Sequence, residues 1–318
     1  MNANRRTFLA HLAAVGGAGL AAALPRARAA APRPRQAEYT MQDATGLAAA
    51  GAAVEKLADG YQFTEGPAAD KAGNVYFTDQ PNDRIVRWGV DGTVADWMKP
   101  CGRSNGLYFD AAGNLLACAD EKNQLWSISP EKKVTVLVED LAGKRLNGPN
   151  DLWVRPDGGV YFTDPFYKRP YWDRGPMEQP CQGVYFLSPD RKGLARVVGD
   201  LKQPNGIIGE PGGRHVYVAD IGDKKTYRYA VGADGSLADR HLLCEKGSDG
   251  MTVDERGNVY LTGRGVLVFA PDGKQIAYFP VPERWTANVT FGGKDRRLLF
   301  ITASKSVYGL KMAVRGGW

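Results

Sequence analysis

The sequence is short of the residues that mark several familiar classes of protein. It has only four cysteines and three histidines in 318 residues, and no two cysteines have the C-x-x-C spacing. This argues against a zinc cluster and a disulfide scaffold, although it leaves open whether one pair of cysteines is bonded. No P-loop, H-E-x-x-H or EF-hand spacing occurs either, which argues against nucleotide hydrolysis, zinc proteolysis and helix-loop-helix calcium sensing.

Charge of one sign is also scarce once the N-terminus is set aside. The formal net charge is +6, but four arginines and no acid lie within residues 1–29, so residues 30–318 carry only +2. No stripe of basic residues interleaved with aromatic ones is present. We therefore expect no nucleic-acid partner.

Residues 1–29 have the organisation of a signal peptide. Arg5-Arg6 precedes an apolar stretch rich in Ala, Gly and Leu, and the small residues Ala27 and Ala29 follow. The pattern resembles a twin-arginine export signal, so we expect a cleaved, periplasmic protein without membrane contact; an uncleaved anchor is the alternative. Residues 30–50, rich in Ala and Pro, are predicted to be a linker, and residues 51–318 the folded domain.

The remaining chain is rich in turn residues, with 39 Gly and 19 Pro in total, and it repeats. Each repeat opens on a small polar pair and continues with an apolar strand, a Gly-containing turn and a second strand of β-branched and aromatic residues. The openings are Glu65-Gly66, Asn105-Gly106, Asn150-Asp151, Asn205-Gly206, Asp249-Gly250 and Asn288-Val289. Repeats of about 40 to 50 residues are typical of propeller blades, so the sequence predicts an all-β, six-bladed β-propeller.

Two further segments complete this prediction. The sixth repeat ends too early to supply an outer strand, and we expect residues 54–63 to provide it and close the ring with an N-terminal strand. The longest interval between openings contains residues 165–182, which include Tyr167, Tyr171 and Trp172. This insertion is either a lid over one face or a surface excursion that packs its own aromatic residues.

The six residues that open the repeats share a chemical property. Inner strands line the axis of a propeller, so these residues should meet there, and every one carries a side-chain oxygen. Oxygen donors that include two carboxylates suit one divalent ion, calcium first and magnesium or manganese next, whereas zinc would favour His or Cys. The alternative is that Asn-Gly and Asp-Gly are only turn residues at strand entry.

The order and spacing of these motifs resemble the gluconolactonase and senescence-marker-protein (regucalcin) family. The resemblance rests on Glu65-Gly66-Pro67, on the run from Asn147 to Leu152, on Pro204-Asn205-Gly206 and on Ser248-Asp249-Gly250. It implies a metal-dependent lactone hydrolase in which Glu65, Asn205 and Asp249 bind the metal and Asn150 is a further ligand or a substrate contact. Gly148 stands where the regucalcin branch has an arginine, so the sugar-acid contacts of that branch do not carry over.

The expected chemistry is hydrolysis of a small lactone whose carbonyl the metal polarises. Asp249 is the candidate general base, and Asn105 and Asn150 could donate to the substrate or its oxyanion. Asp151 could instead be the base, or could cap the strand turn, which we favour. Arg103 is a candidate substrate-binding cation at the mouth of the channel, and the protein is expected to be a monomer or a dimer.

Three rival hypotheses remain at this point. Gly102-Arg103-Ser104-Asn105-Gly106 matches the G-x-S-x-G elbow of serine hydrolases, but it coincides with a propeller opening and no helix is predicted after it. A non-catalytic periplasmic propeller would use the ion only to rigidify the ring. The same site could also act on another ester or a phosphotriester.

Overall fold

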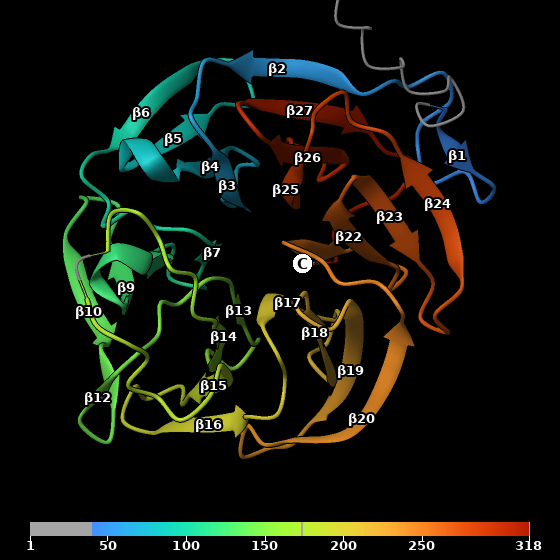
Figure 1. The fold of residues 1–318 in the computed structure, drawn as a ribbon. Helices are drawn as coiled ribbons and strands as arrows, with labels where there is room; N and C mark the ends of the chain where they lie inside the picture. Colours follow the sequence, from blue (N-terminus) through green and yellow to red (C-terminus); the bar gives the residue numbers. More distant parts are fainter. Residues whose placement is uncertain (1–39, 173, 318) are drawn as a thin grey trace, which may run out of the picture. The chain divides into compact units, whose positions relative to one another are not determined.

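The computed structural model describes residues 40–172 and 174–317, so the predicted signal peptide lies outside the described residues. Six antiparallel sheets are arranged around one axis as the blades of a propeller (Figure 1). From the axis outwards, the first three blades are β3 (Thr64–Ala69), β4 (Val75–Asp79), β5 (Arg84–Trp88) and β6 (Val94–Met98); β7 (Leu107–Phe109), β8 (Leu115–Ala119), β9 (Gln124–Ile128) and β10 (Val134–Val138); and β13 (Leu152–Val154), β14 (Val160–Asp164), β15 (Gly183–Leu187) and β16 (Leu194–Val198).

The other three blades repeat this plan. They are β17 (Pro204–Gly209), β18 (His215–Asp220), β19 (Lys225–Val231) and β20 (Leu237–Cys244); β21 (Met251–Val253), β22 (Val259–Gly263), β23 (Gly265–Phe269), β24 (Gln275–Phe279) and β1 (Gln42–Asp43); and β25 (Thr286–Gly292), β26 (Leu298–Ala303), β27 (Ser306–Lys311) and β2 (Glu55–Asp59). Short elements complete the described chain: the 3-10 turns η2 (Gln80–Asn82) and η3 (Asp120–Lys122), and the hairpin β11 (Asp140–Leu141) and β12 (Lys144–Arg145). The all-β, six-bladed prediction is confirmed.

The ring closes as the sequence predicts. β2 is the outer strand of the sixth blade and pairs with β27, with Glu55 opposite Gly309. The first and last parts of the propeller thus share one sheet, and β2 covers the edge that β27 would otherwise expose. No helix among the described residues has the length and hydropathy to cross a bilayer.

The described part of the predicted linker packs on the propeller. Gln42 and Asp43 pair with β24 as a fifth strand of the fifth blade. Leu47 is 1% exposed and belongs to the hydrophobic core. Its carbonyl accepts from Ala313 N, and Ala49 N donates to Lys311 O at the end of β27. An Ala- and Pro-rich composition gave no periodic pattern from which this docking could be predicted.

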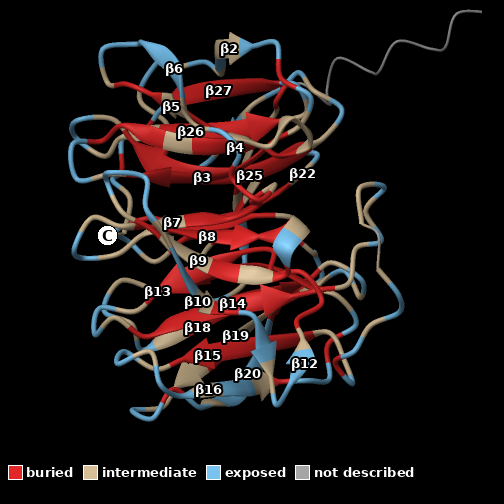
Figure 2. Cartoon of the chain, turned by 90° about the vertical axis from the view of Figure 1, so that its left-hand side faces the viewer, coloured by how far each residue is buried: buried red, intermediate tan, exposed pale blue. Residues whose placement is uncertain are grey.

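The core lies between neighbouring blades. Inner and middle strands are buried, whereas the outer strands β6 and β20 are largely exposed (Figure 2). The recurrent tyrosine of the second strands is buried in three blades, as in Tyr161 and Tyr260, whose hydroxyls donate to Gly235 O at 2.8 Å and to Asp254 Oδ2 at 3.0 Å. Each ring therefore packs between sheets while its polar tip is satisfied.

Candidate active site

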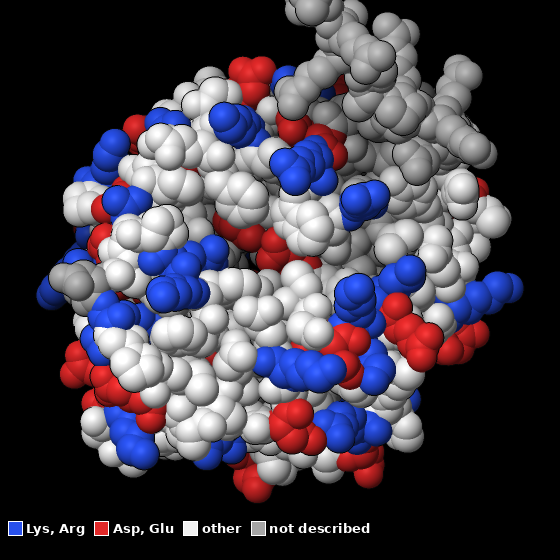
Figure 3. All heavy atoms as spheres, viewed as in Figure 1, with Lys and Arg blue, Asp and Glu red and all other residues white. Residues whose placement is uncertain are grey.

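The structure brings the six opening residues to the same end of the inner strands. Glu65, Asn205 and Asn288 lie within β3, β17 and β25, and Asn105, Asn150 and Asp249 each lie two residues before an inner strand. Five of the six are buried, namely Glu65 3%, Asn105 3%, Asn150 4%, Asn205 2% and Asn288 5%, and Asp249 is partly exposed. On this face the molecule is hollowed at its centre, with acidic side chains at the base of the hollow (Figure 3).

A threonine of one blade positions the opening of the next. In alternate blades a buried threonine near the end of the second strand donates its hydroxyl to a backbone carbonyl at the start of the following blade. The pairs are Thr78 to Asn105 O at 3.1 Å, Thr163 to Asn205 O at 2.7 Å and Thr262 to Ala287 O at 2.8 Å. These bonds fix the backbone from which the axial side chains project.

The glycines of the opening pairs permit close approach at the axis. A Cβ atom at Gly66 would collide with the backbone of Asn105, and one at Gly250 would collide with the side chain of Asn288. Among these opening glycines only Gly66 has a positive φ, of 42°. Crowding at the axis therefore explains the Asn-Gly and Asp-Gly pairs better than turn formation does.

We predict that Gly250→Ala destabilises the protein by about 1–3 kcal/mol, the usual cost of overpacking. The added methyl group must displace Asn288 or widen the ring at the axis. Thermal unfolding should show the loss as a lower Tm. Gly175→Ala is the control, because a Cβ atom there meets nothing within 4 Å; an equal drop in Tm for both variants would contradict the explanation.

Three carboxyl groups, Glu65, Asp151 and Asp249, share the axis. Burial, together with the charge of Asp249, raises the pKa of Glu65 well above its ordinary value. Burial also raises the pKa of Asp249, and it raises the pKa of Asp151 to about 8, with a further contribution from the charge of Asp249. Without an ion, the surroundings thus disfavour the charged forms of these three carboxyl groups.

Neutral donors orient Asp249. Trp285 Nε1 donates to its Oδ2 at 2.6 Å, and Asn205 Nδ2 donates to its Oδ1 at 2.9 Å. The same Asn205 amide lies 2.6 Å from the hydroxyl of Tyr167. Sequence reasoning missed Trp285 as a site residue, because it precedes the sixth opening by three residues and belongs to no repeated phase.

Asn105 and Asn150 are the other amides of the predicted site. Both are buried, yet within the described residues neither side chain has a hydrogen-bond partner. Because a buried amide normally finds partners, these two side chains are available to a bound ion or substrate.

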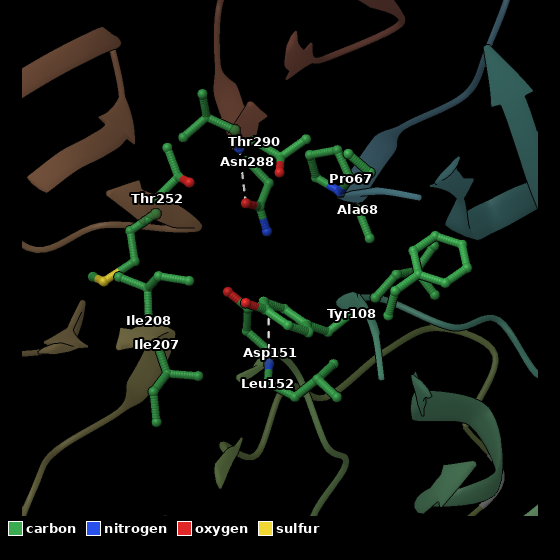
Figure 4. Close-up of a pocket in the computed structure, with 15 residues that line it drawn as sticks. Pro67, Ala68, Tyr108, Asp151, Leu152, Ile207, Ile208, Thr252, Asn288 and Thr290 are labelled. Atoms are coloured by element: carbon green, nitrogen blue, oxygen red, sulfur yellow. Dashed lines mark hydrogen bonds between the residues drawn. The ribbon is translucent and has the colours of Figure 1, made fainter. Parts of the chain in front are cut away.

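Asp151 lies on the inner side of this group. It accepts a hydrogen bond from Leu152 N at 3.0 Å and, with Asn288, lines a small cavity of about 50 Å³ on the axis (Figure 4). Thr252, which also lines this cavity, has a buried hydroxyl without a hydrogen-bond partner in the described structure. This position is compatible with Asp151 as a general base and with Asp151 as a cap of the strand turn.

Arg103 lies at the rim and does not join the axial group. Its Nε lies 3.1 Å from Glu121 Oε1, its guanidinium also donates to Pro81 O, and it stacks 4.7 Å from the ring centre of Tyr171. The neighbouring Ser104 donates its hydroxyl to Cys101 O at 2.6 Å and is fully buried. Ser104 is therefore a structural residue, as expected. A fully buried hydroxyl that donates to a backbone carbonyl is not placed to act as the nucleophile of a serine hydrolase.

The aspartates that close the second strands have two different environments. Asp79, Asp164 and Asp220 each accept backbone N–H groups from the loop that leads into their own blade. Asp120 does not, because Asp83 accepts the corresponding N–H groups of Cys101 and Arg103. Asp120 Oδ2 instead accepts hydrogen bonds from the side chains of Tyr171 and Gln80, so Asp120 faces the insertion.

The insertion of residues 165–182 folds over the axial face. Tyr167 touches Asn205, Tyr171 donates to Asp120, and Arg174 donates to Leu146 O and Asn147 O. A Cβ atom at Gly148 would lie 2.7 Å from Asp120 Oδ1 and 2.8 Å from the Trp172 ring, so only glycine fits beneath it. These contacts favour the lid hypothesis over a surface excursion.

The donor set fits a hard divalent cation. Among residues 40–172 and 174–317 no group of three or more His, Cys, Asp or Glu side chains is arranged to hold an ion alone. A site here must therefore combine the carboxylates of Glu65 and Asp249 with amide oxygens. The Asn205 amide can turn its oxygen toward an ion by rotating 180°, which would also remove its present donation to Asp249.

Fold and site together define a six-bladed β-propeller with a buried, oxygen-rich group on its axis. Residues 63–305 match the family described as SMP-30/Gluconolactonase/LRE-like region. The chain is 30% identical over 294 residues to a gluconolactonase of Zymomonas mobilis subsp. mobilis, covering 83% of this chain and 82% of that protein. The chain therefore belongs to the SMP-30/gluconolactonase/LRE-like family, as its motifs predict.

Solved structures agree with this assignment. A gluconolactonase from Xanthomonas campestris is 30% identical, with a TM-score of 0.81 over 86% of this chain and 94% of that chain. A calcium-binding regucalcin from Agrobacterium tumefaciens shares the fold at 20% identity, with a TM-score of 0.70 over 83% of this chain and 95% of that chain.

Proposed function

We propose that this protein is a metal-dependent lactonase that opens a sugar lactone to the corresponding aldonic acid, with glucono-1,5-lactone as the first candidate substrate. Relatives named gluconolactonase support the reaction class. The observation that carries the proposal is the axial group of the buried Glu65, Asn150 and Asn205 and the partly exposed Asp249, beneath an open hollow.

These four residues are assigned to hold the ion, since metal dependence is general for the family. Calcium is the first candidate, because every donor is oxygen and two donors are carboxylates; magnesium and manganese follow, and zinc fits least. When bound, a divalent ion polarises a lactone carbonyl and lowers the pKa of a nearby water molecule.

Asp249 is the proposed general base that accepts the proton of the attacking water. Trp285 fixes the orientation of its carboxylate without pairing it with a cation. Asn105 and Asn150, whose amides have no protein partner, would donate to the carbonyl oxygen as it becomes negative. Asp151 is assigned a structural role, because it accepts a hydrogen bond from Leu152 N and lines the small axial cavity.

Hydrolysis of glucono-1,5-lactone by the purified protein tests the proposal. Acid release should disappear after chelation and return with a divalent ion, most strongly with calcium. Release no faster than the spontaneous rate with every metal would reject this substrate. Failure on δ-valerolactone, aryl esters and phosphotriesters as well would leave a binding propeller rather than an enzyme.

We also propose that the chain is exported to the periplasm through the twin-arginine-type signal in residues 1–29. The support is the Arg5-Arg6 pair followed by an apolar stretch and small residues. Cell fractionation should recover a shortened chain in the periplasm, and an Arg5→Lys, Arg6→Lys variant should stay in the cytoplasm at full length. A full-length, membrane-bound chain would indicate an anchor instead.

A further inference from the structure

Arg169, in the insertion, forms an ion pair with the protein, but its hydrogen-bonding capacity is not filled. Its Nε lies 3.4 Å from Asp120 Oδ2 in an ion pair, but this buried nitrogen lacks a hydrogen bond of acceptable geometry within the described structure. Its guanidinium carbon lies 4.6 Å from the ring centre of Tyr167. About a quarter of its side chain is exposed.

Other arginines on this face are bonded to the protein. Arg84 donates to Asp79 and Asp96, and Arg103 donates to Glu121 and Pro81 O. Arg174 donates its terminal nitrogens to two backbone carbonyls, although its Nε, like that of Arg169, has no hydrogen-bond partner within the described structure. A guanidinium carries five N–H donors. Because Arg169 is held at Nε and along the face of its guanidinium, its two terminal nitrogens are available to a bound ligand.

Asp120 does not cap backbone N–H groups, and its carboxylate pairs with Arg169 instead. Its counterparts in three other blades cap backbone N–H groups, whereas here Asp83 takes over that capping. The carboxylate is 2% exposed and is also held by Gln80 and Tyr171. It is therefore a fixed anchor for the guanidinium.

Arg169 is placed at the edge of the active site. It stacks on Tyr167, whose hydroxyl touches Asn205, one of the assigned metal ligands. Its positive charge also reaches Asp249, on which it acts as the cation that favours the ionised carboxylate. A lactone bound at the axis would thus extend its substituents toward this guanidinium.

We propose that Arg169, positioned by Asp120, is a specificity-determining residue that binds the hydroxyl groups on the arm of a polyhydroxylated lactone. This inference rests on the proposed lactonase function. The Asp120–Arg169 pair has no net charge, and its carboxylate would repel an anionic arm. The pair is therefore suited to a neutral, hydroxyl-rich ligand, with Tyr167 covering the apolar face of the sugar.

The test compares glucono-1,5-lactone with δ-valerolactone, which has the same six-membered ring and no hydroxyl groups. Arg169→Gln should lower kcat/KM for the hydroxylated lactone about 10- to 100-fold, the usual effect of losing hydrogen bonds from a charged donor. For δ-valerolactone, kcat/KM should stay within about two-fold of the wild-type value. Arg169→Lys keeps the positive charge but lacks the planar guanidinium group. Its kcat/KM for glucono-1,5-lactone should lie between those of the wild type and Arg169→Gln.

Asp120→Asn should reproduce part of this loss through a higher KM for glucono-1,5-lactone, with a smaller change in kcat. Arg174→Met is the matched control: it removes another insertion arginine, which donates to backbone carbonyls and stacks on Trp172 and Phe166, and it should lower Tm without changing the ratio of kcat/KM for the two substrates. Equal losses on both lactones, or no loss on either, would overturn the role of Arg169. A wild-type protein inactive on every lactone would instead reject the proposed function.

Discussion

Replacing Asp249 by Asn should reduce kcat/KM for the lactone by about 10³-fold or more. General-base catalysis alone contributes roughly 10²- to 10⁴-fold, and the same carboxylate is assigned as a metal ligand. The amide keeps the shape of the side chain and can still accept the hydrogen bond from Trp285. Initial rates at saturating calcium would measure the loss.

The metal response of the same variant separates its role from a simple folding defect. A ligand at 100 times its Kd stabilises a protein by about 2.7 kcal/mol, so calcium should raise the Tm of the wild type by several degrees. The Asp249→Asn variant should gain little. Without metal it should be no less stable, because it lacks a carboxyl group whose charged form the surroundings disfavour.

Asp254→Asn is the matched control on the same blade. Asp254 is fully buried just after β21, at the opposite end of that strand from Asp249, and accepts hydrogen bonds from Asn258 and Tyr260. Its replacement should lower Tm and leave turnover and the calcium response intact. Retained hydrolysis or an undiminished calcium response in Asp249→Asn would refute the assignment of Asp249.

The repeat made most of this fold predictable from the sequence. Each opening pair and each second strand such as Val75–Asp79 recurs at one phase, so the blade count, the closing strand and the axial residues all follow from periodicity. The reason for the opening glycines is not visible in the sequence, since close contacts across the axis require them at Gly66 and Gly250.

Residues outside the repeat could not be placed in this way. Trp285, Tyr167 and Arg169 have no counterparts in other blades, and their contacts with the axis depend on how irregular segments fold back over it. Asp120 is the opposite case: it occupies a repeated position, yet its role changed because Asp83 caps the neighbouring loop. Periodicity predicts a position, whereas local contacts decide what the residue there does.

The metal-free protein should lose stability as the pH rises from 5 to 8. Burial raises the pKa of Asp151 to about 8 and that of Asp164 to about 7, so the folded state holds protons that the unfolded chain releases near pH 4. The free energy of unfolding therefore falls as the pH rises from about 4 to these pKa values and changes little above them. At about 1.4 kcal/mol per pKa unit, Asp151 alone would cost roughly 4 kcal/mol across this range.

Guanidinium unfolding in the presence of a chelator, repeated at several pH values, would measure this slope. Asp151→Asn should flatten it, because the amide does not ionise and can still accept from Leu152 N. Saturating calcium should also reduce it, since an ion beside Glu65 and Asp249 favours their charged forms, whereas the contribution of Asp164, which bonds to Asn147 N and Gly148 N, should persist. Constant or rising stability between pH 5 and pH 8 without metal would mean that the buried carboxyl groups are already compensated within the protein, and the electrostatic case for a cation on the axis would fail with it.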